Sequence, residues 1–306
     1  MKKKIFLIFI LFLFFLFALK LIDKILQHTY GLGTPVIYSY SKIYGYGIKP
    51  NQKIKRLKNE IIINDQGMRS KKNWPKNKSS NDFKILFYGD SVTYGGSIVS
   101  NKHLFTEKIC LALKKKNLDS FCGNFGVNGY GLVSIIQKIK YKEINNEDLI
   151  VITLIGSDFT RGFNHIGNQP FWGKKISNYF PASTELFFIY IDKFRNKVKY
   201  TFSEDIFSDI NIKYYEDNFN QLIQVLKKNN KKYIIFYSPS LEEINGSKKY
   251  IFFKNLFNKN ENFYDLKEIK YENKIELYHD NVHLNKKGHH IYSEFMSKKI
   301  LELKKN

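Results

Sequence analysis

The sequence predicts an α/β domain in which helices cover a mostly parallel sheet of five strands. Short apolar runs alternate along the chain with segments of helical spacing, and the first three runs each end in small residues. Parallel strands need long crossover connections, so this alternation is typical of a sheet with helices on its faces. An apolar N-terminus and a turn-rich lead-in precede the domain.

The expected strands are short apolar runs rich in β-branched and aromatic side chains, at residues 85–88, 121–125, 149–155, 233–237 and 263–266. Helical spacing lies between and after them, over residues 102–116, 131–144, 212–228 and 286–304. Residues 159–209 break the alternation with an aromatic-rich insertion that contains Pro170, Trp172 and Pro181. This insertion has two equal interpretations, a substrate-selecting segment and an aromatic excursion that covers the core.

The first residues have the pattern of a membrane helix. Lysines at positions 2–4 precede an apolar run over 5–19. With its continuation past Lys20, this run reaches the length of about 17–25 residues that spans a bilayer. No A-x-A pattern accompanies Ala18, so we expect residues 1–26 to be an uncleaved signal anchor. The lysines favour a cytoplasmic N-terminus, which places the remaining chain in the periplasm or at the cell surface. A buried soluble helix is disfavoured because the run is apolar on every side.

Residues 27–82 are expected to form a lead-in with a short β appendage. Residues 44–50 are turn-rich, residues 60–64 have the pattern of a short strand, and residues 71–80 form a polar connector. The domain proper then occupies residues 83–306.

The chain of 306 residues carries a net charge of +22. We interpret this excess as lysines spread over a solvated surface, with attraction to acidic glycans or phospholipid headgroups as the alternative. No zinc-finger, helix-turn-helix or RNA-binding signature accompanies the charge, which argues against a nucleic-acid partner. The only two cysteines, Cys110 and Cys122, are compatible with a disulfide outside the cytoplasm or with two buried thiols.

A serine follows the first expected strand directly, in Gly89-Asp90-Ser91. In open α/β sheets, ligands bind at the carboxyl edge, so Ser91 stands where a nucleophile is useful. Near the other end of the chain, Asp280 and His283 are three residues apart. A carboxylate at this spacing can orient the imidazole that takes the serine proton. Taken alone, Ser91 is compatible with a helix N-cap and His283 with a surface histidine, but together they favour catalysis.

These residues resemble the SGNH (GDSL-type) hydrolases in four blocks, in order, over roughly residues 83–300. Residues 124–129 are similar to the family's second block, whose glycine, here Gly129, gives a backbone N–H to the oxyanion hole. Residues 154–158 occupy the third block, where the family usually has Gly-x-Asn-Asp and this chain has Ser157 in place of the asparagine. The resemblance implies a three-layer, flavodoxin-like sandwich, and the lead-in resembles the β appendage of some membrane-anchored bacterial members.

The resemblance also implies a membrane-anchored serine esterase or O-acyltransferase that acts through an acyl-serine. Ser91, Asp280 and His283 would be catalytic, and Ser91, Gly129 and Ser157 would form the oxyanion hole. No cofactor or metal is required. The expected substrates are ester groups of envelope glycans, O-acetyl above all, with a lipid ester or thioester as runner-up.

A second hypothesis is a catalytically weak SGNH-like module that binds polysaccharide or scaffolds an envelope-modification complex. The serine at position 157 and the basic surface motivate it. A charge-driven nucleic-acid binder is a third hypothesis, which the expected topology disfavours. Asp90 is expected to brace the turn before Ser91. His279, His289 and His290 are expected to be structural, and the sequence leaves the protein partners open.

Overall fold

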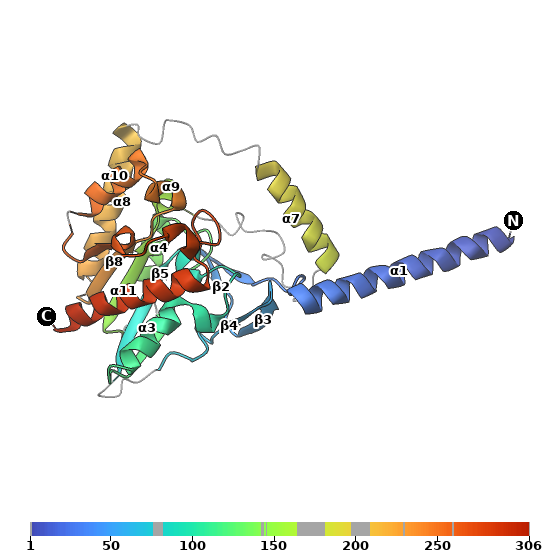
Figure 1. Ribbon diagram of the computed structural model, residues 1–306, viewed down its shortest axis with the longest axis horizontal. Coiled ribbons are helices and arrows are strands. Elements are labelled where there is room, and N and C mark those ends of the chain that lie inside the picture. The colour runs from blue at the N-terminus through green and yellow to red at the C-terminus, as the bar shows by residue number, and fades with distance from the viewer. Residues whose placement is uncertain are drawn as a thin grey trace.

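The computed structural model describes residues 2–75, 82–141, 144, 146–163, 181–196, 209–228, 230–258 and 260–305. A central sheet lies between helices, and a long N-terminal helix projects away from it (Figure 1). The five strands of this sheet are β5 (Phe83–Gly89), β6 (Ser120–Asn124), β7 (Leu149–Leu154), β8 (Lys232–Tyr237) and β9 (Phe263–Asp265). Their order is β6-β5-β7-β8-β9, and all neighbours run parallel. This is the strand order of flavodoxin-like folds, which confirms the predicted α/β class.

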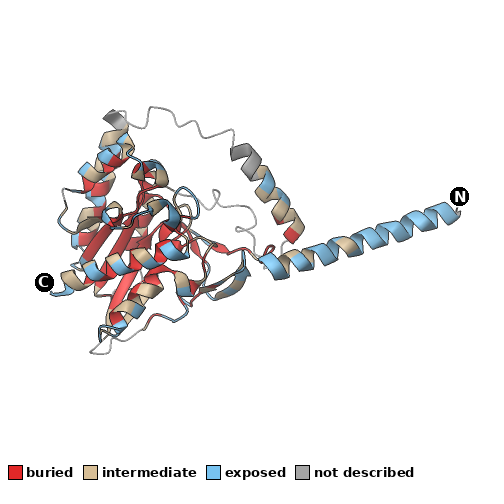
Figure 2. Ribbon diagram, viewed as in Figure 1, coloured by how far each residue is buried: buried red, intermediate tan, exposed pale blue. Residues whose placement is uncertain are grey.

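Two helical layers bury the two faces of the sheet (Figure 2). Side chains of α4 (Leu132–Lys140), α8 (Asp209–Lys228) and α10 (Lys248–Phe257) pack on one face. Side chains of α3 (Phe105–Lys114) and α11 (Lys286–Lys305) pack on the other. Because β5 and β7 are covered on both sides, their sequences are continuous apolar runs rather than alternating ones.

Shorter elements connect these layers: α2 (Ser91–Tyr94), η1 (Asn101–His103), α5 (Gly156–Thr160), α9 (Leu241–Ile244), η4 (Leu266–Glu268) and η5 (Lys274–Leu277). The helix expected over 102–116 is divided into η1 and α3, because Leu104 between them has extended backbone angles. Neither α9 nor α10 was expected from the hydrophobic pattern. Ser240 caps α9 through a capping box with Glu243, and Ser247 caps α10, so capping residues were the available signal.

The lead-in contains two antiparallel hairpins, β1 (Tyr38–Ser41) with β2 (Gly45–Ile48) and β3 (Gln52–Arg56) with β4 (Asn59–Ile63). The turn-rich segment 44–50 therefore contains the strand β2, which the sequence analysis did not identify. Residues of β2 are all buried, because the hairpin packs against the main domain and shares its hydrophobic core. Met68 and Trp74 join the same core, and a Cβ on Gly123 of β6 would lie 2.5 Å from the sulfur of Met68.

The N-terminal helix α1 (Lys2–Tyr30) is long and apolar enough to cross a membrane, and its apolar side chains are exposed (Figure 2). These properties fit a membrane anchor or a signal sequence. Near its end, Asp23 accepts a hydrogen bond of 2.8 Å from the backbone N–H of Ser183, in α7 (Ala182–Asn196). The helix α7 belongs to the expected insertion over residues 159–209, of which residues 164–180, with Pro170 and Trp172, and residues 197–208 lie outside the described part of the chain.

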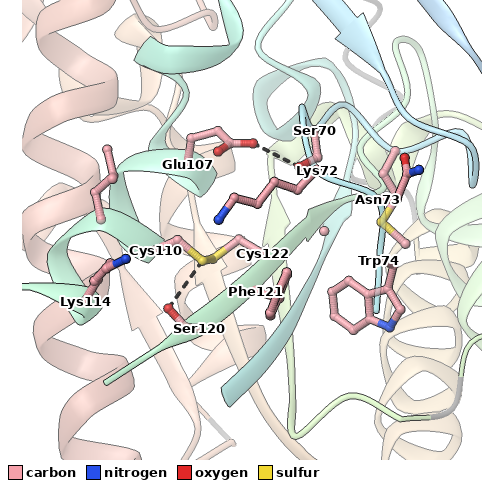
Figure 3. A pocket seen from close by; sticks show the side chains of 13 residues that line it. Ser70, Lys72, Asn73, Trp74, Glu107, Cys110, Lys114, Ser120, Phe121 and Cys122 are labelled. Carbon is pink, nitrogen blue, oxygen red and sulfur yellow. Dashed lines mark hydrogen bonds between the residues drawn. A yellow bond between two sulfur atoms is a disulfide. The ribbon is translucent and has the colours of Figure 1, made fainter. Parts of the chain in front are cut away.

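Cys110 of α3 and Cys122 of β6 form a disulfide, with Cα atoms 6.0 Å apart (Figure 3). Of the two alternatives compatible with the sequence, the structure therefore has the disulfide. Trp74 and Glu107 line a small cavity beside it, of about 120 Å³. Disulfides persist in oxidising compartments, so this bond accords with a domain outside the cytoplasm.

Replacing Cys110 and Cys122 together by alanine should lower the free energy of unfolding by about 3 kcal/mol, because the disulfide closes a short loop that otherwise gains entropy on unfolding. Denaturant unfolding of the full chain measures this loss. Reduction of the wild type should reproduce it, and reductant should leave the double variant unchanged. Equal stability of the oxidised wild type and the double variant would contradict the prediction.

Candidate functional site

The loops that follow three neighbouring strands, β6, β5 and β7, lie together at the carboxyl edge of the sheet. In the register of the sheet, Gly89 of β5 lies beside Thr153 of β7, and Phe87 lies beside Asn124 of β6. Ser91, Ser157 and Gly129 come shortly after these positions. The sheet thus brings to one edge three residues that are far apart in the sequence, as parallel pairing requires.

A tight turn presents Ser91 at this edge. A Cβ on Gly89 would lie 2.2 Å from the hydroxyl of Thr93 and 2.5 Å from the carbonyl oxygen of Thr153, so only glycine fits there. Asp90 is the N-cap of α2, and its Oδ1 accepts a 2.8 Å hydrogen bond from the backbone N–H of Val92. Ser91 is therefore the first residue of the helix rather than its cap.

A rigid loop carries Asp280 and His283. It is closed by an antiparallel bridge between Tyr278 and Leu284 and by a 2.7 Å hydrogen bond from His279 N–H to the carbonyl of His283. Oδ1 of Asp280 accepts the backbone N–H groups of Val282 at 3.0 Å and His283 at 2.8 Å. These two backbone hydrogen bonds fix the orientation of the carboxylate that contacts the imidazole of His283.

A continuous series of hydrogen bonds joins Ser91, His283 and Asp280. The Oγ of Ser91 lies 2.9 Å from Nε2 of His283, and Nδ1 of His283 lies 2.8 Å from Oδ2 of Asp280. A carboxylate can only accept, so Nδ1 of the neutral imidazole carries the proton and Nε2 accepts from the serine hydroxyl. A second carboxylate also faces the hydroxyl, since Oδ2 of Asp90 lies 3.3 Å from Oγ of Ser91.

The charges around the imidazole favour its protonated form. Burial lowers the pKa of His283, but the hydrogen bond to Asp280 and the negative charges of Asp280 and Asp90 outweigh it, and the pKa is raised above 6.5. Burial also acts to raise the pKa of Asp280. Its hydrogen bonds from His283 and Val282 outweigh this effect and lower that pKa well below its usual value. The pair therefore suits an imidazole that becomes positively charged during a reaction.

Arg161 was not recognised in the sequence, and it joins the three loops of the edge. Its Nη1 lies 3.1 Å from Oδ2 of Asp90, 3.3 Å from Oδ1 of Asp158 and 3.0 Å from the carbonyl oxygen of Tyr130. Burial and the charge of Asp90 raise the pKa of Asp158, while Arg161 opposes them. Its position three residues after Asp158, at the end of the short helix α5, was the only sequence signal.

Gly129 and Ser157 are held at the edge through their chain neighbours, Tyr130 and Asp158, which both contact Arg161. Gly129 has a positive φ of 77°, which favours glycine. Ser157 is the second residue of α5 and is partly exposed. The structure thus joins three of the expected site residues by direct hydrogen bonds and places the other two on the adjoining loops.

Two of the other histidines noted in the sequence, His289 and His290, take no part in these hydrogen bonds, and His279 meets His283 through its backbone N–H. His289 is buried, its Nδ1 accepts the backbone N–H of Phe105 at 3.3 Å, and burial lowers its pKa to about 3. His290 lies 3.6 Å from Glu294 on the exposed side of α11. In the described part of the chain, no three His, Cys, Asp or Glu side chains gather as metal ligands.

Neither protein-family models nor curated proteins gave a match to this chain. Among similar solved structures, the lipase Lip_vut3 from a goat rumen metagenome has a TM-score of 0.47 and 14% identity, over 72% of this chain and 97% of its own. The acetyl xylan esterase AlAXEase has a TM-score of 0.42 and 16% identity, over 72% and 98%. A member of the lipolytic G-D-S-L family from Veillonella parvula has a TM-score of 0.42 and 12% identity, over 72% and 97%. At such values the similarities carry no argument about function.

The pKa of His283 should lie above 6.5 and should fall when Asp280 is replaced by asparagine, because Asp280→Asn removes the charge that stabilises the imidazolium. NMR of labelled histidine side chains against pH measures both values. His289 is the internal contrast, since it should stay neutral throughout the neutral range. A pKa of His283 that does not respond to Asp280→Asn would show that the pair is not coupled in solution.

Proposed function

We propose that this chain is a membrane-anchored SGNH-type serine esterase or O-acyltransferase. The observation that carries the proposal is the hydrogen-bonded chain Ser91–His283–Asp280 at the carboxyl edge of the sheet. In such an arrangement the serine is the nucleophile, the histidine is base and then acid, and the carboxylate orients the imidazole.

In the acylation step, Oγ of Ser91 attacks the carbonyl carbon of the ester while its proton passes to Nε2 of His283. Asp280 stabilises the resulting imidazolium through Nδ1–H. The bond from the carbonyl carbon to the leaving oxygen then breaks, and His283 gives the proton to that oxygen. In the second step, water or an acceptor hydroxyl attacks the acyl-serine, His283 takes its proton, and Ser91 is released protonated.

Negative charge develops on the former carbonyl oxygen in both steps. The backbone N–H groups of Ser91 and Gly129 would stabilise it, with the hydroxyl of Ser157 as a third donor. Ser157 has a shorter side chain than the asparagine of the family, and its hydroxyl would donate to the oxyanion directly or through a water. Loss of one such donor costs about 10²–10³ in rate in a well-studied protease, so a large part of the rate depends on whether the hydroxyl of Ser157 donates.

The proposed substrates are O-acetyl or similar ester groups of envelope glycans, with lipid esters or thioesters as the runner-up. The position of the carboxyl edge in the molecule supports a site that lies near the membrane. The helix α11 begins just after the His283 loop and ends at the C-terminus, on the side of the molecule opposite α1 (Figure 1). The edge therefore lies toward the appendage and α1, so a spanning α1 would keep Ser91 close to the bilayer surface.

The second candidate is a catalytically weak module that binds polysaccharide or scaffolds an envelope-modification complex. The serine at position 157 favours it. The short contacts of His283 with both Ser91 and Asp280 favour the enzyme, since a binding module has no need of them.

Ser91→Ala and His283→Ala should each lower hydrolysis of a small activated acetyl ester by about 10³-fold or more, because each removes a member of the proton-transfer chain. The measurement uses the purified full chain in detergent. Ser120→Ala and His290→Ala are matched controls outside the site and should keep wild-type rates.

Equal inertness of the folded wild type and both variants would contradict the esterase. An assay with an acyl donor and a glycan acceptor would then test strict acyl transfer. If transfer were also absent, the binding module would become the leading hypothesis.

Ser157→Ala should lower kcat by about tenfold or more with little change in KM, because an oxyanion donor acts mainly in the transition state. Ser157→Asn, which restores the amide of the family, should recover the lost rate. Thr160→Ala is the control, since its hydroxyl only bonds the carbonyl of Ser157 at 3.1 Å. Full activity in Ser157→Ala would exclude the hydroxyl as a donor.

A further inference from the structure

We propose that Tyr46, in the appendage hairpin, is a positioning residue for the oxyanion hole. It holds the Asn128–Gly129 peptide so that the N–H of Gly129 faces the developing negative charge. The inference rests on the function proposed above and extends the site beyond the main domain.

The β1–β2 hairpin is bonded to both neighbours of Gly129. The hydroxyl of Tyr46 donates to the carbonyl oxygen of Asn128 at 2.7 Å. The side-chain amide of Asn128 donates to the hydroxyl of Tyr38 at 3.1 Å, and the hydroxyl of Tyr130 donates to the backbone carbonyl of Tyr46. Residues 128 and 130 are thus fixed by an element that lies more than eighty positions earlier in the chain.

The aromatic rings around these bonds are tightly packed. The ring of Tyr46 makes edge-on contacts with Tyr38, at a centroid distance of 5.6 Å, and with Tyr130, at 5.2 Å. Tyr46 and Tyr130 are fully buried. Burial is the main cause that raises the pKa values of Tyr38 and Tyr130, so their hydroxyls remain protonated. The hairpin is therefore held against the 128–130 loop by buried aromatic packing as well as by hydrogen bonds.

The carbonyl of Asn128 and the N–H of Gly129 belong to the same peptide unit. A trans peptide is planar, and its C=O and N–H point in opposite directions. A donor fixed on the oxygen therefore fixes the direction of the N–H on the other side. It also polarises the amide and strengthens the N–H as a donor. Within the loop, the backbone N–H of Tyr130 donates to the carbonyl of Val127 at 3.2 Å. The hydroxyl of Tyr46 adds to this turn a contact from outside the loop.

Tyr46→Phe tests the inference because it removes the hydroxyl and keeps the ring. We expect kcat for the acetyl ester to fall about tenfold with KM nearly unchanged, which is the effect of one neutral hydrogen bond. The affinity for a boronic acid should fall by a similar factor, since its tetrahedral adduct on Ser91 places an oxygen in the oxyanion hole. Both measurements use the full chain in detergent.

Tyr38→Phe is the matched control, because that hydroxyl contacts the Asn128 side chain and not the peptide. It should change stability as Tyr46→Phe does while kcat and boronic acid affinity stay at wild-type values. Should Tyr46→Phe fail to fold, Tyr130→Phe removes the bond from the 128–130 loop to the backbone carbonyl of Tyr46 and should lower kcat several-fold at constant KM.

Equal kcat losses in Tyr38→Phe and Tyr46→Phe, or a change in KM alone, would overturn the positioning role and leave the esterase standing. A wild type without Ser91-dependent turnover would overturn both. The two failures are therefore distinguishable.

Discussion

One guanidinium nitrogen, Nη1 of Arg161, connects the three loops on which the candidate site depends. Its partners are Asp90 after β5, the carbonyl of Tyr130 after β6 and Asp158 after β7. Each partner is adjacent in sequence to a proposed site residue, namely Ser91, Gly129 or Ser157. Removing one member of a buried charge network leaves the others unpaired, which typically costs about 3–5 kcal/mol. The same contact therefore stabilises the edge of the sheet and sets the relative positions of the loops that carry the proposed nucleophile and oxyanion donors.

The acid–base half of the site depends on a different support. The loop of Asp280 and His283 is tied to the loop after β8, because the backbone N–H of Leu241 donates to the carbonyl of Asn281 at 2.8 Å. The hydroxyl of Tyr278 donates to the carbonyl of Pro239 at 2.6 Å. The imidazole thus reaches Ser91 from a loop near the C-terminal end of the chain. Arg161 bonds Asp90, the residue directly before Ser91. Neither half can shift alone without lengthening the 2.9 Å contact between Ser91 and His283.

The sequence predicted the strands and the hydrogen-bonded trio for physical reasons that act locally. Strands β5 and β7 are buried on both faces, so their composition alone marks them. Asp280 and His283 are three residues apart, so their pairing needs no knowledge of the fold. Arg161 and Tyr46 were missed because each acts through contacts that only the fold creates. The hairpin β1–β2 has few apolar residues in alternation, and its burial comes entirely from docking on the domain.

The appendage contacts residues beside the site at two places, so it does more than connect α1 to the main domain. Tyr46 bonds the carbonyl of Asn128 beside the oxyanion loop. On the other side, buried Arg69 donates to the carbonyl of Tyr94, the last residue of the short helix that Ser91 begins, at 2.6 Å. Its guanidinium also stacks over the ring of Tyr94, 4.6 Å from the centroid. Because the appendage follows α1 directly in the chain, an anchored α1 would be joined to the nucleophile helix and to the oxyanion loop through buried, hydrogen-bonded contacts. The site would then keep a fixed distance from the membrane surface.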